Sequence, residues 1–150
     1  MLVKRISFLV VLLLLAAACV FAQTIRNGGA AADVGPIRSS PAYAEILLRS
    51  TELQAETEAL GADYTEENPK IIDLRFEIKA LEKARESILA VNAAESGKLT
   101  LALGKLMVRR AGLETELSRL QRSYKNDHPE VKRARRRLEV FDAAIKEILP

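Results

Sequence analysis

The sequence predicts an all-α protein that is built from two tandem antiparallel helical hairpins, an arrangement related to coiled coils and four-helix bundles. Leu, Ala, Glu, Lys and Arg dominate its composition, which is typical of long helices. Apolar residues recur at alternating spacings of three and four positions along the chain from residue 41 onward. In addition, residues 41–90 and 101–150 form an internal repeat, and such a repeat sets the architecture of a chain.

The two copies of the repeat are sixty positions apart, and 11 of their 50 aligned positions are identical. The match is clearest where Tyr64 precedes Pro69 and Tyr124 precedes Pro129. The first copy contains 6 Lys+Arg and 11 Asp+Glu, a net charge of −5, whereas the second contains 12 and 7, a net charge of +5. These opposite charges predict that the two copies attract each other.

Residues 1–22 have the features of a secretory signal peptide. Two basic residues, Lys4 and Arg5, precede an apolar run that is somewhat shorter than the ~20 residues of a membrane span. Cleavage after Ala22 would leave a mature chain without cysteine. Two alternatives stay open, namely lipidation at Cys19, because the residues before it resemble a lipobox, and an uncleaved anchor. All three predict an exported protein that is periplasmic or associated with the cell envelope.

The segment 23–40 contains three glycines and one proline without a period, and it predicts a flexible linker. Ser40-Pro41 then supplies a helix cap and a first helical residue. The first hairpin is expected over 41–94, with helices over 41–62 and 69–94 that a polar turn joins. The apolar seam of its second helix consists of Ile71, Leu74, Ile78, Leu81 and Ile88.

Residues 95–98 break the apolar pattern and are predicted to connect the two hairpins. The second hairpin is expected over 99–150, with helices over 99–123 and 129–149. Each apolar stripe is too narrow to stabilise a helix alone, so each helix must bury its stripe on another. Whether the hairpins pack within one chain or between chains stays open. The two stripes of the second hairpin are Leu103, Leu106, Leu113, Leu117, Leu120 and Tyr124, and Val131, Ala134, Leu138, Phe141, Ile145 and Ile148.

The turn of the second hairpin carries a recognisable pattern between Leu117 and Val131. A leucine-bearing helix ends in Tyr124, polar residues follow, and His128-Pro129 precedes the apolar residue that opens the next helix. This pattern resembles the coiled-coil hairpin tip of bacterial polysaccharide chain-length determinant and exopolysaccharide export proteins. The first copy matches it more loosely, with Asn68 in place of the histidine. The resemblance implies an exported helical hairpin with a role in polysaccharide export.

The densest cluster of charge lies at the start of the last predicted helix, where basic residues flank an apolar seam. The cluster consists of Lys132, Arg133, Arg135, Arg136 and Arg137. One interpretation is an intramolecular match to acidic residues of the first copy, such as Glu56 and Glu66. The other is a surface for an anionic partner, such as lipid head groups, an acidic polysaccharide or an acidic protein. Nucleic acid is not expected, because the chain is exported and no aromatic residues are interleaved for stacking.

Three ring side chains stand at the predicted turns. Tyr64 and Tyr124 end helices at equivalent positions and are expected to cover the ends of their seams, with contact to a partner as the alternative. His128 is the only histidine, and no cysteine or second histidine stands at ligand spacing from it. It is therefore expected to cap the helix that Pro129 opens.

These features predict a non-catalytic interaction or scaffold protein that needs no cofactor and no metal. The sequence shows no nucleophile–base pair, metal-binding set or phosphate loop. The expected partner is another protein or a further copy of the chain, bound through the helical seams, and membrane contact is expected only through the signal or a lipid anchor. The alternative function is a periplasmic chaperone that grips unfolded proteins between basic helical arms.

Overall fold

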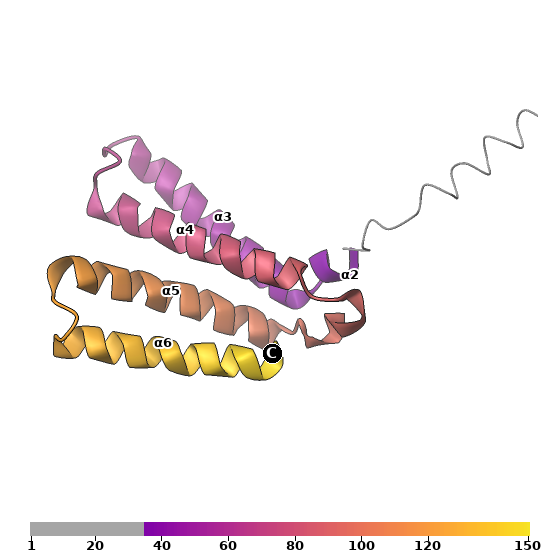
Figure 1. Ribbon diagram of the computed structural model, residues 1–150. Helices are drawn as coiled ribbons and strands as arrows, with labels where there is room; N and C mark the ends of the chain where they lie inside the picture. Colours follow the sequence, from indigo (N-terminus) through magenta and orange to yellow (C-terminus); the bar gives the residue numbers. More distant parts are fainter. Residues whose placement is uncertain (1–34) are drawn as a thin grey trace, which may run out of the picture. The chain divides into compact units, whose positions relative to one another are not determined.

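The structure, a computed structural model, describes residues 35–150, and this part of the chain is all-helical, without a strand (Figure 1). The predicted signal peptide, Cys19 and most of the predicted linker lie outside the described residues. The predicted all-α class and the two helical hairpins are confirmed. The elements are α2 (Gly35–Arg38), α3 (Pro41–Gly61), α4 (Pro69–Leu89), the 3₁₀ helix η1 (Ala93–Lys98), α5 (Leu101–Ser123) and α6 (Pro129–Ile148).

Side-chain caps start the four long helices, and they repeat with the sequence. The Ser40 hydroxyl accepts a hydrogen bond from the backbone of α3, and the Thr100 hydroxyl does the same at α5, both at 3.3 Å. Asn68 and His128 each accept from a backbone N–H two residues later, at 2.9 and 3.3 Å. Each of these two caps precedes a proline at the first helical position. The histidine is therefore a cap, as predicted, and the asparagine of the first copy fills the same place.

Two boundaries differ from the sequence prediction by more than two residues. The second helix of the first hairpin ends at Leu89 instead of residue 94, and η1 fills much of the connection between the hairpins. Asn92 causes this change, because its side chain caps η1 by accepting from the N–H of Ala94 at 3.1 Å. The predicted linker is wrong for its last residues. Gly35–Arg38 form a helical turn there, because Ile37 is buried in the core.

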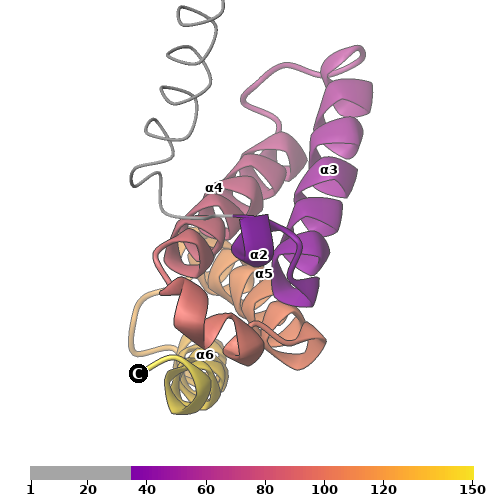
Figure 2. The same cartoon turned by 90° about the vertical axis from the view of Figure 1, so that its right-hand side faces the viewer.

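The two hairpins are stacked, and α5 is the central helix. It packs against α3, α4 and α6, whereas α6 packs mainly against α5. The turns of both hairpins lie at one end of the bundle, opposite η1 (Figure 1). An end-on view places α6 on the far side of α5 from α3 and α4 (Figure 2). One outward face of α6 is therefore left without a neighbouring helix in the described part of the chain.

The core lies between the first hairpin and α5. Its fully buried side chains include Ile46, Leu53, Leu81, Ile88 and Leu103. The buried face of α5 is wider than the single stripe that the sequence predicts, because this helix packs on the first hairpin and on α6 at the same time. Leu106, Leu117 and Leu120 of that stripe are only half-buried, and Tyr124 is exposed. The buried residues that the stripe leaves out are Gly104, Met107, Ala111 and Thr115.

Candidate interaction surface

The predicted basic cluster lies in the first three turns of α6. All five of its residues are exposed, while Val131 and Ala134 of the same turns are buried. The helical period explains this arrangement, since residues three and four apart share a face and the intervening residues point elsewhere. The cluster is therefore a solvent-exposed surface of α6, and the opposite side of this helix packs against the rest of the fold.

The structure does not pair this cluster with the acidic first copy, so the intramolecular interpretation is wrong for it. Arg133 pairs with Glu130 of its own helix, and Arg137 lies 3.7 Å from Glu116 of α5. Arg135 donates to Asn126 at 3.4 Å. The other two cluster residues, Lys132 and Arg136, form no ion pair within residues 35–150. The physical reason is distance, because α5 separates α6 from the first hairpin.

The two hairpins are joined by one ion pair among the described residues, between Arg122 of α5 and Asp73 of α4. Other acidic residues of the first hairpin pair within it. Glu56 lies 3.1 Å from Lys70, and Glu66 lies 2.8 Å from Arg75. The hydrogen bond and the charge of Arg75 lower the pKa of Glu66 below its ordinary value.

A partly buried cluster of charges joins α3 to α4. Arg49 contacts Glu77 at 3.0 Å and Glu52 at 3.3 Å. Burial lowers the pKa of Arg49, but the hydrogen bonds and charges of Glu77 and Glu52 raise it by more, so its pKa lies above the ordinary value. Arg110 of α5 holds Asp142 of α6 in a corresponding way. Each hairpin is thus clamped by an arginine of its first helix.

The two predicted tyrosine sites differ in the structure. The ring of Tyr124 stacks on that of His128, with centroids 4.2 Å apart and planes inclined by 20°. The turn between α5 and α6 lies beside the basic cluster, because this stack and the hydrogen bond from Arg135 to Asn126 hold it there. Tyr64 lies in the turn of the first hairpin, is also exposed, and has no stacking partner among residues 35–150. Both side chains are about half exposed, Tyr64 by 54% and Tyr124 by 46%, so the expectation that they cover the ends of their seams stays a prediction.

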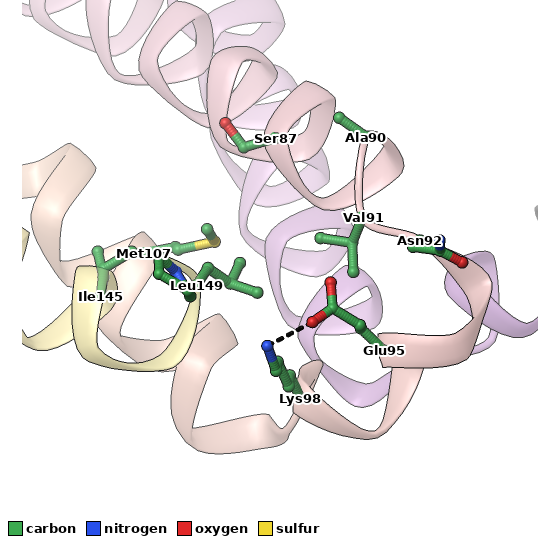
Figure 3. A pocket seen from close by; sticks show the side chains of 10 residues that line it. Ser87, Ala90, Val91, Asn92, Glu95, Lys98, Met107, Ile145 and Leu149 are labelled. Atoms are coloured by element: carbon green, nitrogen blue, oxygen red, sulfur yellow. Dashed lines mark hydrogen bonds and ion pairs between the residues drawn. The ribbon is translucent and has the colours of Figure 1, made fainter.

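A pocket of about 570 Å³ lies at the other end of the bundle, where α4, η1, α5 and the end of α6 meet (Figure 3). Its lining combines the apolar side chains of Val91, Met107 and Leu149 with an ion pair between Lys98 and Glu95 at 2.6 Å. The hydroxyl of Ser87 also lines it, but this group donates to a backbone carbonyl of its own helix. The lining therefore offers no activated nucleophile.

Residues 35–150 contain neither a candidate metal site nor a helix that could span a membrane. No group of three His, Cys, Asp or Glu side chains in this range is placed to hold a metal ion. None of the helices described for this range is long and apolar enough to cross a membrane.

Sequence reasoning missed three exposed apolar residues, two on α3 and one on α6. Leu47 and Leu48 of α3 are 44% and 58% exposed, and Val140 of α6 is 66% exposed. All three lie outside the predicted seams, so the apolar periodicity gave no reason to expect a role for them. The signal that could have found them is the repeat itself, because each aligns with a residue that the structure buries or half-buries, namely Met107, Val108 and Ala80.

Comparisons with protein-family models, with curated proteins and with solved structures give no match to this sequence. The similarity of the second turn to polysaccharide export proteins therefore stays a prediction.

Proposed function

We propose that this chain is an exported, non-catalytic interaction protein of the cell envelope, and that the outward face of α6 binds its partner. The observation that carries the proposal is Val140, a large apolar side chain that is 66% exposed on a helix rich in charge. The face around it carries Arg133 and Arg136 on one side and Ala143 on the other, all exposed. An apolar centre with a charged rim is the usual anatomy of a protein-binding surface.

The spacing of this face supports a helical or extended acidic partner. Arg133, Arg136, Val140 and Ala143 follow one another at intervals of three and four, so they form one stripe along α6. The N-terminal part of α6, residues 129–137, holds five basic residues and one acidic residue, a net charge of +4. A partner with matching negative charge would be steered to this stripe and held in register by it.

A link to polysaccharide export is supported only by the resemblance of the second turn. The Tyr124–His128 stack gives that turn a defined shape next to the basic cluster, which suits a docking tip. The presence of polysaccharide export genes beside the coding sequence would support this finer proposal, and their absence would leave it without support.

The alternative, a chaperone that grips clients between helical arms, has less support. The groove between the first hairpin and α5 has a volume of about 440 Å³, and its lining includes Arg49, Glu77, Arg109 and Glu116. Charged walls of this kind do not favour unfolded apolar segments, because covering charged groups with apolar chain removes them from water, which is costly. A light-scattering assay with an unfolded outer-membrane protein tests it, and suppressed aggregation would revive this alternative.

Photo-crosslinking in the cells that make the protein tests the main proposal. A photoreactive residue replaces Val140, and a matched control replaces Ile72, an exposed apolar residue on α4 of the first hairpin. We expect a defined protein adduct at position 140 and none at position 72. Equal labelling at both positions, or no protein adduct at position 140, would contradict a partner surface on α6.

A further inference from the structure

Because the two hairpins are copies of one sequence unit, each surface residue of the first hairpin can be compared with the residue at the equivalent position of the second. Each residue of the first hairpin has a repeat equivalent, the residue sixty positions later. The structure shows how one hairpin packs on the other inside the chain, since α5 lies on both α3 and α4. The repeat equivalents of these contact surfaces can therefore be located, and their exposure can be compared.

Within the chain, one face of α5 covers the first hairpin. This face includes Gly104, Met107, Ala111 and Thr115, which are buried, and Val108, which is half-buried. The packing is tight at Gly104, where an added Cβ would lie 2.8 Å from the Cα of the facing Ala42. This face is thus a contact surface between hairpins.

The first hairpin carries the same face on α3, and there it is uncovered. The repeat equivalents on α3 are Ala44, Leu47, Leu48, Thr51 and Ala55, and all five are exposed. Leu48 is 58% exposed, although leucine is among the residues most often buried in folded proteins. We call this stripe the α3 face.

The surface that receives α5 also has an uncovered equivalent. On α4 it includes Ala80, which is 4% exposed, and Asp73, which pairs with Arg122 of α5. The repeat equivalents on α6 are Val140, which is 66% exposed, and Arg133, which is also exposed. The outward face of α6 described above is therefore the equivalent of a surface that binds a helix within the chain.

The segments that carry the two uncovered faces have opposite net charges. Residues 41–68, which comprise α3 and its turn, contain one basic and seven acidic residues, a net charge of −6. The first part of α6 has a net charge of +4. Glu58 and Asp63 form no ion pair within residues 35–150, and neither does Arg136. Arg122 pairs with Asp73 within the chain, and the repeat equivalents of these two residues are Ala62, which directly precedes Asp63, and Arg133. An equivalent contact between copies is therefore expected to place Asp63 near Arg133.

We propose that the α3 face of one copy packs on the α5–α6 hairpin of a second copy, in the way that α5 packs on α3 and α4 within the chain. The inference rests on the proposed function, because it names the occupant of the outward face of α6. The two contacting surfaces differ, so the interface is heterologous and leaves one free α3 face and one free α6 face after each addition. Copies therefore add head to tail, as hairpins do in a solenoid of helical repeats.

Sedimentation of the protein, purified in the form that the cell makes, tests this inference. Leu48→Glu blocks the α3 face, and Val140→Glu blocks the α6 face. Ile72→Glu is the matched control, since it places the same charge on an exposed residue outside both faces. All three positions are exposed, so folding is expected to persist, which circular dichroism checks. The wild type and the control are expected to form species of increasing size as concentration rises, whereas each blocked variant alone stays monomeric.

Mixing the two blocked variants gives the sharper result. Leu48→Glu keeps its α6 face and Val140→Glu keeps its α3 face, so an equal mixture is expected to form dimers and nothing larger. A wild type that stays monomeric at the highest concentration, a Leu48→Glu variant that still associates alone, or a mixture without dimers would each overturn the inference. In particular, association of Leu48→Glu alone would indicate a symmetric contact between α6 helices.

The same experiments separate this inference from the proposed function. If the wild type is monomeric and a different protein is crosslinked at position 140, stacking is wrong and the partner surface on α6 stands. If position 140 gives no protein adduct and the chain is monomeric, both are wrong. An adduct of twice the mass of the chain, together with the dimer in the mixture, supports both.

Discussion

Gly104 is the residue that permits the close approach of α3 and α5. A Cβ at this position would lie 2.8 Å from the Cα of Ala42, 2.9 Å from the Cβ of Glu45 and 3.0 Å from the carbonyl oxygen of Ala42. Two of these atoms belong to the backbone, which cannot move aside as a flexible side chain can. The glycine is therefore needed for packing, although glycine is a poor residue for a helix interior.

We expect Gly104→Ala to lower the free energy of unfolding by about 1–3 kcal/mol, because overpacking forces the two helices apart. Gly112→Ala is the matched control in the same helix, since a Cβ there meets nothing within 4 Å. This control is expected to raise the free energy of unfolding by roughly 0.5–1 kcal/mol through helix propensity. Urea denaturation followed by circular dichroism measures both changes, and shifts of the same sign would contradict the tight contact.

The ion pair at the first turn predicts a pH dependence. Arg75 lowers the pKa of Glu66 below its ordinary value of 4.5 through a hydrogen bond and charge attraction. A carboxyl whose pKa is lower in the folded state stabilises the fold above its unfolded-state pKa, and this contribution is lost as the pH falls through the folded-state pKa. NMR titration of the Glu66 carboxyl is expected to show a midpoint below 4.5 that rises in Arg75→Gln. An unchanged midpoint in the variant would show that the pair does not form.

At the scale of elements, the helices differ in how many neighbours support them. α5 packs against three helices and buries a wide face, whereas α6 packs mainly against α5 and leaves Val140 and its neighbours exposed. Local stability follows the amount of buried apolar contact, so elements with fewer contacts open at lower free energy. The helix that carries the proposed surface is thus expected to be the less stable one.

Hydrogen exchange measured by mass spectrometry tests this order. The amides of the middle of α6 are expected to exchange faster than those of the middle of α5 at low protein concentration. Protection of α6 is expected to rise with concentration if copies stack, because its outward face then becomes covered. Equal protection of the two helices in the monomer would contradict the structural argument.

At the scale of the whole molecule, charge is divided between the two sides of the stack. The acidic α3 and its turn lie on one hairpin, and the basic start of α6 lies on the other, with α5 between α3 and α6. Few charges cross between the hairpins, where Arg122 and Asp73 form the ion pair. Most of the acidic charge of the first hairpin and most of the basic charge of α6 therefore do not hold the two hairpins together and can contact partners.

Reversing Arg135, Arg136 and Arg137 to Glu tests this division. We expect the free energy of unfolding to change by less than about 1 kcal/mol, because the only ion pair that these residues lose within the described range 35–150 is the exposed contact between Arg137 and Glu116. Binding of the partner is expected to weaken by more than about tenfold at low salt, and the difference from wild type is expected to shrink at high salt. Thermal unfolding and sedimentation measure the two effects. Unchanged binding at low salt would show that these charges face only solvent.

The local features of this protein could be predicted from its sequence. The caps at Ser40, Asn68 and His128 and the prolines after them start helices where expected, because these signals act within a few residues. The hairpin arrangement follows from short turns between amphipathic helices. Ile71, Leu81 and Ile88 are buried as their spacing predicted, because each helix must bury its stripe.

Only the tertiary structure decided which further faces are covered. Apolar periodicity indicates one buried seam per helix. A helix that lies between two neighbours, such as α5, buries two faces, so the burial of Met107 and Ala111 was not predicted. The pairing of charges was also undetermined, because it depends on which helices lie within a few ångströms of each other. The sequence by itself determined the hairpins and the division of charge between them. The packing of α5 between them left Leu48 and Val140 exposed, since a face is buried only where a neighbouring helix reaches it.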